Sequence, residues 1–419
     1  MDEPHNQVTN PGSIQGLVNE NKGTVIQNFG AQAPRTPERV FDVPYARNDL
    51  FTGRGDLLKR LHDHFRQQRA AAINGLGGIG KTQAALEYAY RHKDEYPYVF
   101  WTNAAGDVTL SDDFVKIARL LRLPEKDEAD QTVVVEAVKN WLAEHDGWLL
   151  ILDNADDLAL ARRFIPAGVH GHILLTTRKA ATVARGFSVA AMDEEEGALF
   201  LLRRAGKLAS PDPAALAQVS ASEREAAVAI VREMAGLPLA LTQAGAYIAD
   251  AASPVADYLP AYKRRRTGLL ARSDEESQYP ASVATTWLLS FEKVARRDPL
   301  AAELLLVLAF LAPDAIPEEL LITGASELGP TLQPLVGDPT LLNDACAALS
   351  HFSLVQRDTA QRLLAIHRLV QTIIQANLPD DETRRQWAES VVRAVNKAFP
   401  DVENINNWPQ CERYLPHAL

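Results

Sequence analysis

Residues 75–82 read GLGGIGKT and decide how the rest of the chain is interpreted. Their spacing, G-x-x-x-x-G-K-[ST], is that of a phosphate-binding P-loop. Glycines let the backbone curl so that successive N–H groups point into one concavity, where a polyphosphate fits at the positive end of the next helix. The lysine reaches the β- and γ-phosphates and the threonine hydroxyl binds Mg²⁺. The residues expected to contact the nucleotide here are Gly75, Gly77, Gly78, Ile79, Gly80, Lys81, Thr82 and Gln83.

The segments on either side supply the strand and the helix that a P-loop needs. Residues 70–74 (AAAIN) predict a short buried strand, and residues 82–91 (TQAALEYAYR) predict a helix. The alternative is a glycine-rich surface turn, which requires neither neighbour. The order of strand, loop and helix therefore favours a nucleotide site.

Three further apolar runs predict more strands of the same sheet. They are residues 98–103 (YVFWTN), 148–152 (WLLIL) and 172–177 (HILLTT), and helical segments separate them. Continuous apolar runs are typical of parallel strands buried on both faces. Strands that alternate with helices imply a parallel sheet that binds ligands at the carboxyl ends of its strands. The predicted fold class is an α/β P-loop NTPase domain with a parallel sheet.

Asp153 follows the run WLLIL directly and is the acidic partner that a P-loop requires. We expect it to hold Mg²⁺ opposite Thr82. Many P-loop ATPases place a second acid immediately after the first, but here that residue is Asn154, a poor base. Asp156 or Asp157 could substitute, although a capped helix start explains both equally well. Slow hydrolysis is therefore expected.

Arg178 ends the run HILLTTR on the same predicted edge of the sheet. An arginine there can reach a γ-phosphate and report its presence. The alternative is an ordinary surface arginine. The residues to which we assign catalytic roles are Lys81, Asp153 and Arg178.

The second half of the chain is mainly helical, because strand signals fade after residue 193. Two short strands are predicted at residues 354–357 and 362–366, with apolar helices before them and a helix at 369–378 after them. Helices followed by a small β-wing suggest a winged-helix domain. Residues 1–40 are polar and form either a weak hairpin or a flexible leader.

Bulk properties exclude several classes of protein. The net charge of −11 disfavours general nucleic-acid binding, and the basic run 263–266 (KRRR) is interpreted as a solvated helix end. Two cysteines form no disulfide framework, so a reducing cytoplasm fits. No apolar run reaches membrane-spanning length. The pairs His62-x-His64 and His170-x-His172 lack nearby cysteine or carboxylate partners at ligand spacing, so no zinc site is expected.

Five motifs in this order resemble the NB-ARC class of STAND NTPases, which are nucleotide-operated switch modules. They are GLGGIGKT, LLILDNADD, HILLTTR, GLPLA and IHRLV, and the resemblance covers about residues 41–419. It implies a P-loop domain at 41–191, a small helical domain at 192–276, a winged helix at 277–378 and a helical linker at 379–419. Residues 411–418 (CERYLPHA) look like the lead-in to a TPR sensor that this chain lacks.

The resemblance also assigns residues outside the loop to the site. Val43 and Arg54 would lie beside the adenine and ribose, and Pro238 would pack on the base. His367 would contact the β-phosphate of ADP and hold the closed state, the alternative being a packed core histidine. The family's histidine is usually followed by Asp, whereas this chain has Arg368.

The function implied is an ADP/ATP-dependent switch that is closed with ADP and Mg²⁺ at the site and self-associates after exchange to ATP. Its partners would be its own C-terminal sensor and a ligand or protein signal. The switch would act in signalling, defence or transcriptional regulation. Two other classes stay open. One is a steady-turnover P-loop enzyme such as an AAA-type remodeller or a small-molecule kinase, and the other is a winged-helix DNA-binding regulator.

Overall fold

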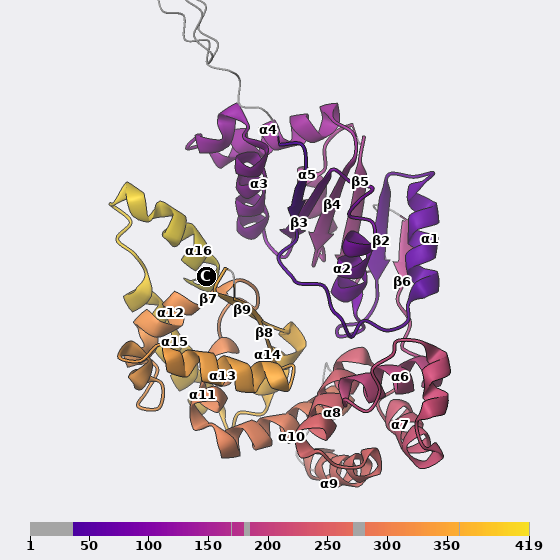
Figure 1. Ribbon diagram of the computed structural model, residues 1–419. Coiled ribbons are helices and arrows are strands. Elements are labelled where there is room, and N and C mark those ends of the chain that lie inside the picture. Colours follow the sequence, from indigo (N-terminus) through magenta and orange to yellow (C-terminus); the bar gives the residue numbers. More distant parts are fainter. Residues whose placement is uncertain (1–36, 169, 180–184, 271–280, 360, 419) are drawn as a thin grey trace, which may run out of the picture.

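A six-stranded parallel sheet forms the core of the first part of the chain in this computed structural model, which describes residues 37–168, 170–179, 185–270, 281–359 and 361–418 (Figure 1). The strand order is β1-β3-β4-β5-β2-β6, and every neighbouring pair is parallel. The strands are β1 (Val40–Asp42), β2 (Ala70–Asn74), β3 (Tyr98–Asn103), β4 (Trp148–Asp153), β5 (His172–Thr177) and β6 (Arg185–Ser188). The predicted parallel α/β class is confirmed.

Helices cover both faces of this sheet because its apolar side chains alternate between two cores. Leu149 and Ile151 of β4 join the core that contains the first two helices, whereas Leu150 and Leu152 join the opposite core. Residues of a strand point alternately to its two faces, so one apolar run serves both. The first face carries α1 (Gly55–Phe65) and α2 (Lys81–Arg91); the second carries α3 (Asp107–Leu121), α4 (Gln131–Glu144) and α5 (Leu158–Phe164).

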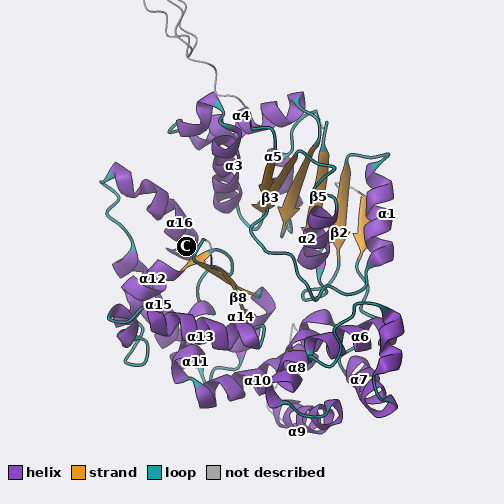
Figure 2. Ribbon diagram, in the orientation of Figure 1, coloured by secondary structure: helices purple, strands orange, loops and turns teal. Residues whose placement is uncertain are grey.

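After β6 almost all regular structure is helical, as Figure 2 shows. Four helices follow the sheet and pack on one another: α6 (Glu194–Arg204), α7 (Ala221–Glu233), α8 (Pro238–Ala251) and α9 (Tyr258–Leu270). Acidic residues open α6 and Asp193 caps it, as a helix start with a positive dipole end favours. No helix among the described residues combines the length and the apolar character needed to cross a membrane.

The last part of the chain combines helices with a small antiparallel sheet of order β7-β9-β8. The predicted strands at 354–357 and 362–366 are found, and β7 adds a two-residue strand. The elements are α10 (Ala281–Arg297), α11 (Pro299–Leu308), β7 (Ile316–Pro317), α12 (Glu318–Gly324), α13 (Thr340–His351), β8 (Val355–Asp358), β9 (Leu363–Ile366), α14 (Arg368–Ala376), α15 (Asp381–Ala398) and α16 (Trp408–Ala418).

This last part curves back beside the main sheet, where α16 contacts α3 (Figure 1). The assignment of this part as a winged-helix domain remains a prediction, and so do the domain boundaries proposed above. The possible hairpin in residues 1–36 lies outside the described residues.

A glycine in the motif GLPLA lets the turn between α7 and α8 pack closely against the segment that leads into α6. Gly236 has a φ of +64°, and a Cβ there would lie 2.1 Å from the carbonyl oxygen of Met192. Its own carbonyl accepts a hydrogen bond of 2.9 Å from the Met192 N–H. Only glycine satisfies both the left-handed backbone and this close approach.

We predict that Gly236→Ala lowers the free energy of unfolding by about 2–4 kcal/mol, because strain and overlap add. Gly206→Ala is the matched control, since Gly206 has a φ of +69° but no atom within 4 Å of the added Cβ. The control should lose only about 1 kcal/mol in thermal or chemical unfolding. Equal losses would contradict the close approach.

Candidate nucleotide-binding site

The P-loop lies at the carboxyl edge of the main sheet, between β2 and the start of α2. Gly78 and Gly80 have φ values of +76° and +93°, which side-chain-bearing residues rarely adopt. No side chain caps the N-terminus of α2, so its first N–H groups remain available to an anion. The loop backbone and the uncapped start of α2 therefore form a candidate site for a phosphate.

Lys81 bends back over this cradle. Its Nζ donates hydrogen bonds of 2.9 Å to the carbonyl oxygens of Gly75 and Leu76. Burial lowers the pKa of Lys81, and the carboxylates of Asp156 and Asp153 oppose that effect. These two carbonyls accept hydrogen bonds from the Lys81 ammonium group, which would otherwise point at phosphate oxygens. The lysine is therefore already held over the loop.

Asp153 ends β4 with its carboxylate buried. Thr82 Oγ1 donates to its Oδ1 at 3.0 Å, and Thr176 Oγ1 donates to the same oxygen. Burial raises the pKa of Asp153 to about 6, the Thr176 bond opposes that shift, and the negative charge of Asp314 adds to it. A buried carboxylate beside a hydroxyl is the hard-oxygen donor set that Mg²⁺ prefers, so the predicted metal pair, Thr82 and Asp153, fits the ion.

The two candidates for a second acid are both engaged. Asp156 accepts hydrogen bonds from the backbone N–H of Arg178 at 2.7 Å and from its Nε at 2.5 Å. Asp157 caps α5 by accepting from the N–H groups of Ala159 and Leu160. Asn154 therefore has no free carboxylate beside it in this loop. Arg178 reaches the predicted edge, where its Nε is held by Asp156.

The predicted base-binding residues lie on the segment before α1. Arg54 donates its backbone N–H to Glu196 Oε1 at 2.8 Å, and its Nη1 lies 3.9 Å from Glu196 Oε2. Its buried Nη2 has no hydrogen-bond partner among the described residues, and burial lowers the pKa of this arginine. That nitrogen is available to a ligand acceptor. Val43 packs against the core beside α1 and α2, and Gln83 accepts from Asn48 Nδ2 at 2.8 Å.

Arg203 of α6 holds the segment 49–52, which leads to Arg54. No motif or pattern in the sequence predicts this role. Its guanidinium donates to the carbonyl oxygens of Asp49, Leu50 and Phe51 at 2.8–3.1 Å. It also donates to Thr52 Oγ1 at 2.7 Å. Four bonds from one buried side chain hold this segment in a single shape.

The start of α8 touches the P-loop, as the predicted role of Pro238 requires. Pro238 is the first residue of α8. The next N–H, of Leu239, donates to the carbonyl oxygen of Gly78 at 3.2 Å, and the Leu239 side chain covers the same glycine. The helical part therefore sits directly on the phosphate loop, and Pro238 stands beside it.

His367 caps the N-terminus of α14 and faces the P-loop from the last part of the chain. Its Nδ1 accepts the N–H of Leu369 at 3.1 Å, so in the neutral ring the proton sits on Nε2. Surrounding protein lowers the pKa of His367 to about 4, and the positive charges of Lys81 and Arg368 add to this effect. The residue is nevertheless exposed to solvent.

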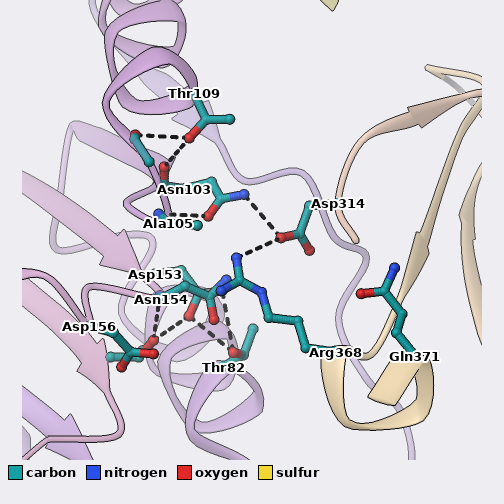
Figure 3. A network of polar contacts seen from close by, with 12 residues as sticks. Thr82, Asn103, Ala105, Thr109, Asp153, Asn154, Asp156, Asp314, Arg368 and Gln371 are labelled. Atoms are coloured by element: carbon teal, nitrogen blue, oxygen red, sulfur yellow. Dashed lines mark hydrogen bonds and ion pairs between the residues drawn. The ribbon is translucent and has the colours of Figure 1, made fainter. Parts of the chain in front are cut away.

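A polar clasp, formed by Asn103, Asp314 and Arg368, joins the last part of the chain to the sheet edge (Figure 3). Asn103 Nδ2 at the end of β3 donates to Asp314 Oδ2 at 3.1 Å, and Arg368 Nη2 lies 3.9 Å from the same oxygen. Burial raises the pKa of Asp314, while Arg368 and Asn103 oppose that shift. The arginine that replaces the family's Asp thus has a carboxylate partner 54 positions earlier in the chain.

Comparison with known proteins supports the assignment of a P-loop nucleotide-binding domain. A family model described as an AAA domain matches residues 62–177, and a domain of unknown function, DUF7779, matches residues 290–383. A nucleotide-binding leucine-rich repeat (NLR)-like protein of Hyaloscypha variabilis is 28% identical over 424 residues, covering 91% of this chain and 40% of that protein. Regulatory protein AfsR of Streptomyces coelicolor is 28% identical over 260 residues, covering 57% and 25%.

One solved structure shares the fold over most of the chain. It is a STAND protein with a tetratricopeptide repeat sensor from Pyrococcus horikoshii, with a TM-score of 0.50 at 16% identity, and it covers 90% of this chain and 49% of that one. The chain therefore resembles STAND-type P-loop NTPases in sequence and in fold. It spans less than half the length of each of these three proteins.

We predict that Asp153→Asn raises the melting temperature of the metal-free protein at pH 7.5, because a buried carboxylate is costly without a cation. A folded pKa of about 6 lies above that of an unfolded aspartate, so the wild type gains stability as the pH falls through 6 toward 4. The advantage of the variant should shrink over that window in thermal scans. Asp157→Asn, where either residue caps the helix, is the control. A gain in melting temperature that does not change with pH would contradict a raised pKa of Asp153.

The clasp predicts coupling between Asp314 and Arg368. Arg368→Gln removes the cation that faces a half-buried carboxylate, so it should destabilise the wild type more than it destabilises Asp314→Asn. A double-mutant cycle by chemical unfolding is expected to give a coupling of about 1 kcal/mol. Additive effects would show that the ion pair contributes nothing.

Proposed function

We propose that this chain is an ADP/ATP-operated switch of the STAND type, whose nucleotide ties its first and last parts together. One observation carries the proposal: His367, which caps α14, feels the charge of Lys81, and Arg368 beside it lies near Asp153 and Thr82 (Figure 3). A nucleotide bound by the P-loop would then touch both parts at once. Its presence and its charge would decide whether they stay together.

Each group has a distinct task in the proposed closed state. The loop N–H groups and Lys81 would bind the phosphates, while Thr82 and Asp153 would hold Mg²⁺, which neutralises phosphate charge. The free Nη2 of Arg54 would meet a ribose or base acceptor opposite Pro238. The other residues predicted to contact the nucleotide are Val43, Gln83 and the glycines of the loop.

His367 would donate its Nε2–H to the β-phosphate of ADP. Neutral imidazole suits this task because Nδ1 is already an acceptor of the Leu369 N–H, which fixes the ring. A pKa near 4 keeps the donor neutral throughout the physiological range. The contact would therefore respond to the nucleotide and not to small changes in pH.

Slow turnover is part of the proposal. A switch must keep its nucleotide long enough to hold a state, and Asn154 does not supply the base that fast hydrolysis uses. Asp156 is held by Arg178, and Asp157 caps α5. An approaching γ-phosphate would have to draw Arg178 away from Asp156, which would free that carboxylate only in the ATP state.

The nucleotide alone would not complete the switch. A change from 1:99 to 99:1 needs about 5.5 kcal/mol of differential affinity. One charge-assisted phosphate contact is worth about 1.5–3 kcal/mol. A sensor and its ligand are therefore expected to supply the rest and to release a surface for self-association. The names of the curated relatives, an NLR-like protein and a regulatory protein, support a signalling or regulatory output.

We expect His367→Ala to speed the release of a fluorescent ADP analogue by about tenfold to a hundredfold, as the loss of one such contact implies. Stopped-flow displacement by excess unlabelled ADP measures the rate. His170→Ala, an exposed histidine at the start of β5, should leave the rate unchanged. An unchanged rate in His367→Ala would refute the proposed contact.

A further inference from the structure

A second group of ligand-type side chains lies at the opposite, amino edge of the main sheet. His62 is in the last turn of α1, His92 ends α2, and Glu95 stands shortly before β3. Glu95 Oε1 is 2.6 Å from His92 Nδ1, and Glu95 Oε2 is 3.9 Å from His62 Nε2. The two imidazole rings stack with centroids 4.2 Å apart.

The expectation that these histidines lack a carboxylate partner is therefore wrong for His62, and also for His170, whose Nδ1 lies 3.5 Å from Asp146 Oδ1. The sequence pairs it with His64, but the His64 Nε2 lies 3.0 Å from the carbonyl oxygen of Ala70. The turn after α2 brings His92 and Glu95 to His62 instead. His172 faces Tyr96 through a 2.7 Å contact and does not join the group.

The three donors lie close together. One ligand atom from each residue lies within 4.8 Å of the other two. Tetrahedral Zn²⁺ with bonds of about 2.0–2.1 Å requires donors roughly 3.3 Å apart, so a modest rotation of the side chains closes the site. The two imidazoles are mostly covered, whereas the Glu95 side chain is 54% exposed and free to rotate.

The surroundings of His62 favour ligation. Its Nδ1 lies 3.4 Å from the Tyr88 hydroxyl, which orients the ring and leaves Nε2 toward Glu95. Burial and the neighbouring His92 lower the pKa of His62, and a neutral imidazole is the form that binds metal. The positive charge of Arg66 also lowers the pKa of His62, whereas the negative charges of Glu95 and Asp63 raise it.

Solvent reaches the group through a hollow of about 230 Å³. His62 and Glu95 line it, together with the first residues of β4 and β5. The hollow leaves room for a water molecule in the fourth position of a tetrahedral site. An entry path and an open coordination position are therefore both present.

We propose that His62, His92 and Glu95 bind one divalent transition-metal ion, with Zn²⁺ as the reference. Two imidazoles and a carboxylate suit Zn²⁺, Co²⁺, Ni²⁺ and Cu²⁺, whereas Mg²⁺ prefers an all-oxygen set. The ion bridges the far ends of α1 and α2, whose near ends begin beside Arg54 and at Lys81. It acts as a brace behind the nucleotide site and does not depend on the proposed switch.

The test titrates the tag-free full chain with Zn²⁺, in excess Mg²⁺ and ADP so that Thr82 and Asp153 are occupied. Calorimetry is expected to show one Zn²⁺ per chain, and thermal scans a rise in melting temperature. Co²⁺ should give the visible absorption of a tetrahedral site. His92→Gln and Glu95→Gln should each weaken binding by tenfold or more.

His170→Gln is the matched control, because His170 also pairs with a carboxylate, with its Nδ1 3.5 Å from Asp146, and lines the same hollow. It should bind Zn²⁺ as the wild type does. Circular dichroism and metal-free melting show whether each variant folds, and the exposed Glu95 makes Glu95→Gln the safer of the two. Absence of saturable Zn²⁺ binding in the wild type, or unchanged binding in folded Glu95→Gln, overturns the proposal.

Discussion

The carboxylate of Asp153 is the constraint around which this structure is arranged. It ends a strand that is buried along its whole length, so its charge cannot be solvated by water. Two threonine hydroxyls donate to it, yet its pKa still rises to about 6. Only a cation removes the remaining cost, and the P-loop beside it supplies the place for the phosphates that such a cation accompanies. The buried charge therefore makes the empty site unstable and the loaded site favourable.

The last part of the chain meets this edge through polar contacts that are individually weak. The ion pair of the clasp spans 3.9 Å, and the Arg368 side chain is 40% exposed. Such pairs contribute little free energy. In the proposed switch, a ligand or a partner would therefore separate the two parts without breaking a strong polar contact.

The sequence predicts the parts whose signal is local. The P-loop and the strands β2, β3, β4 and β5 were found because continuous apolar runs and a fixed motif carry them. The short strands β1, β6 and β7 were missed, since none of them carries a continuous apolar run or stands in a recognisable hairpin as β8 and β9 do. The partners Asp314, Arg203 and Glu95 were missed for another reason: each meets its counterpart through tertiary packing across tens of residues. The change to Arg368 was the one hint, because an arginine near a buried site calls for a carboxylate.

The most direct test of the account is to denature the protein as purified and to identify the released nucleotide by chromatography. The account predicts about one ADP per chain, held through purification because the two parts close over it and hydrolysis is slow. A chain that emerges empty and turns ATP over steadily, near one per second or faster, would contradict it. That result would favour a turnover enzyme and would leave His367 as an ordinary helix cap.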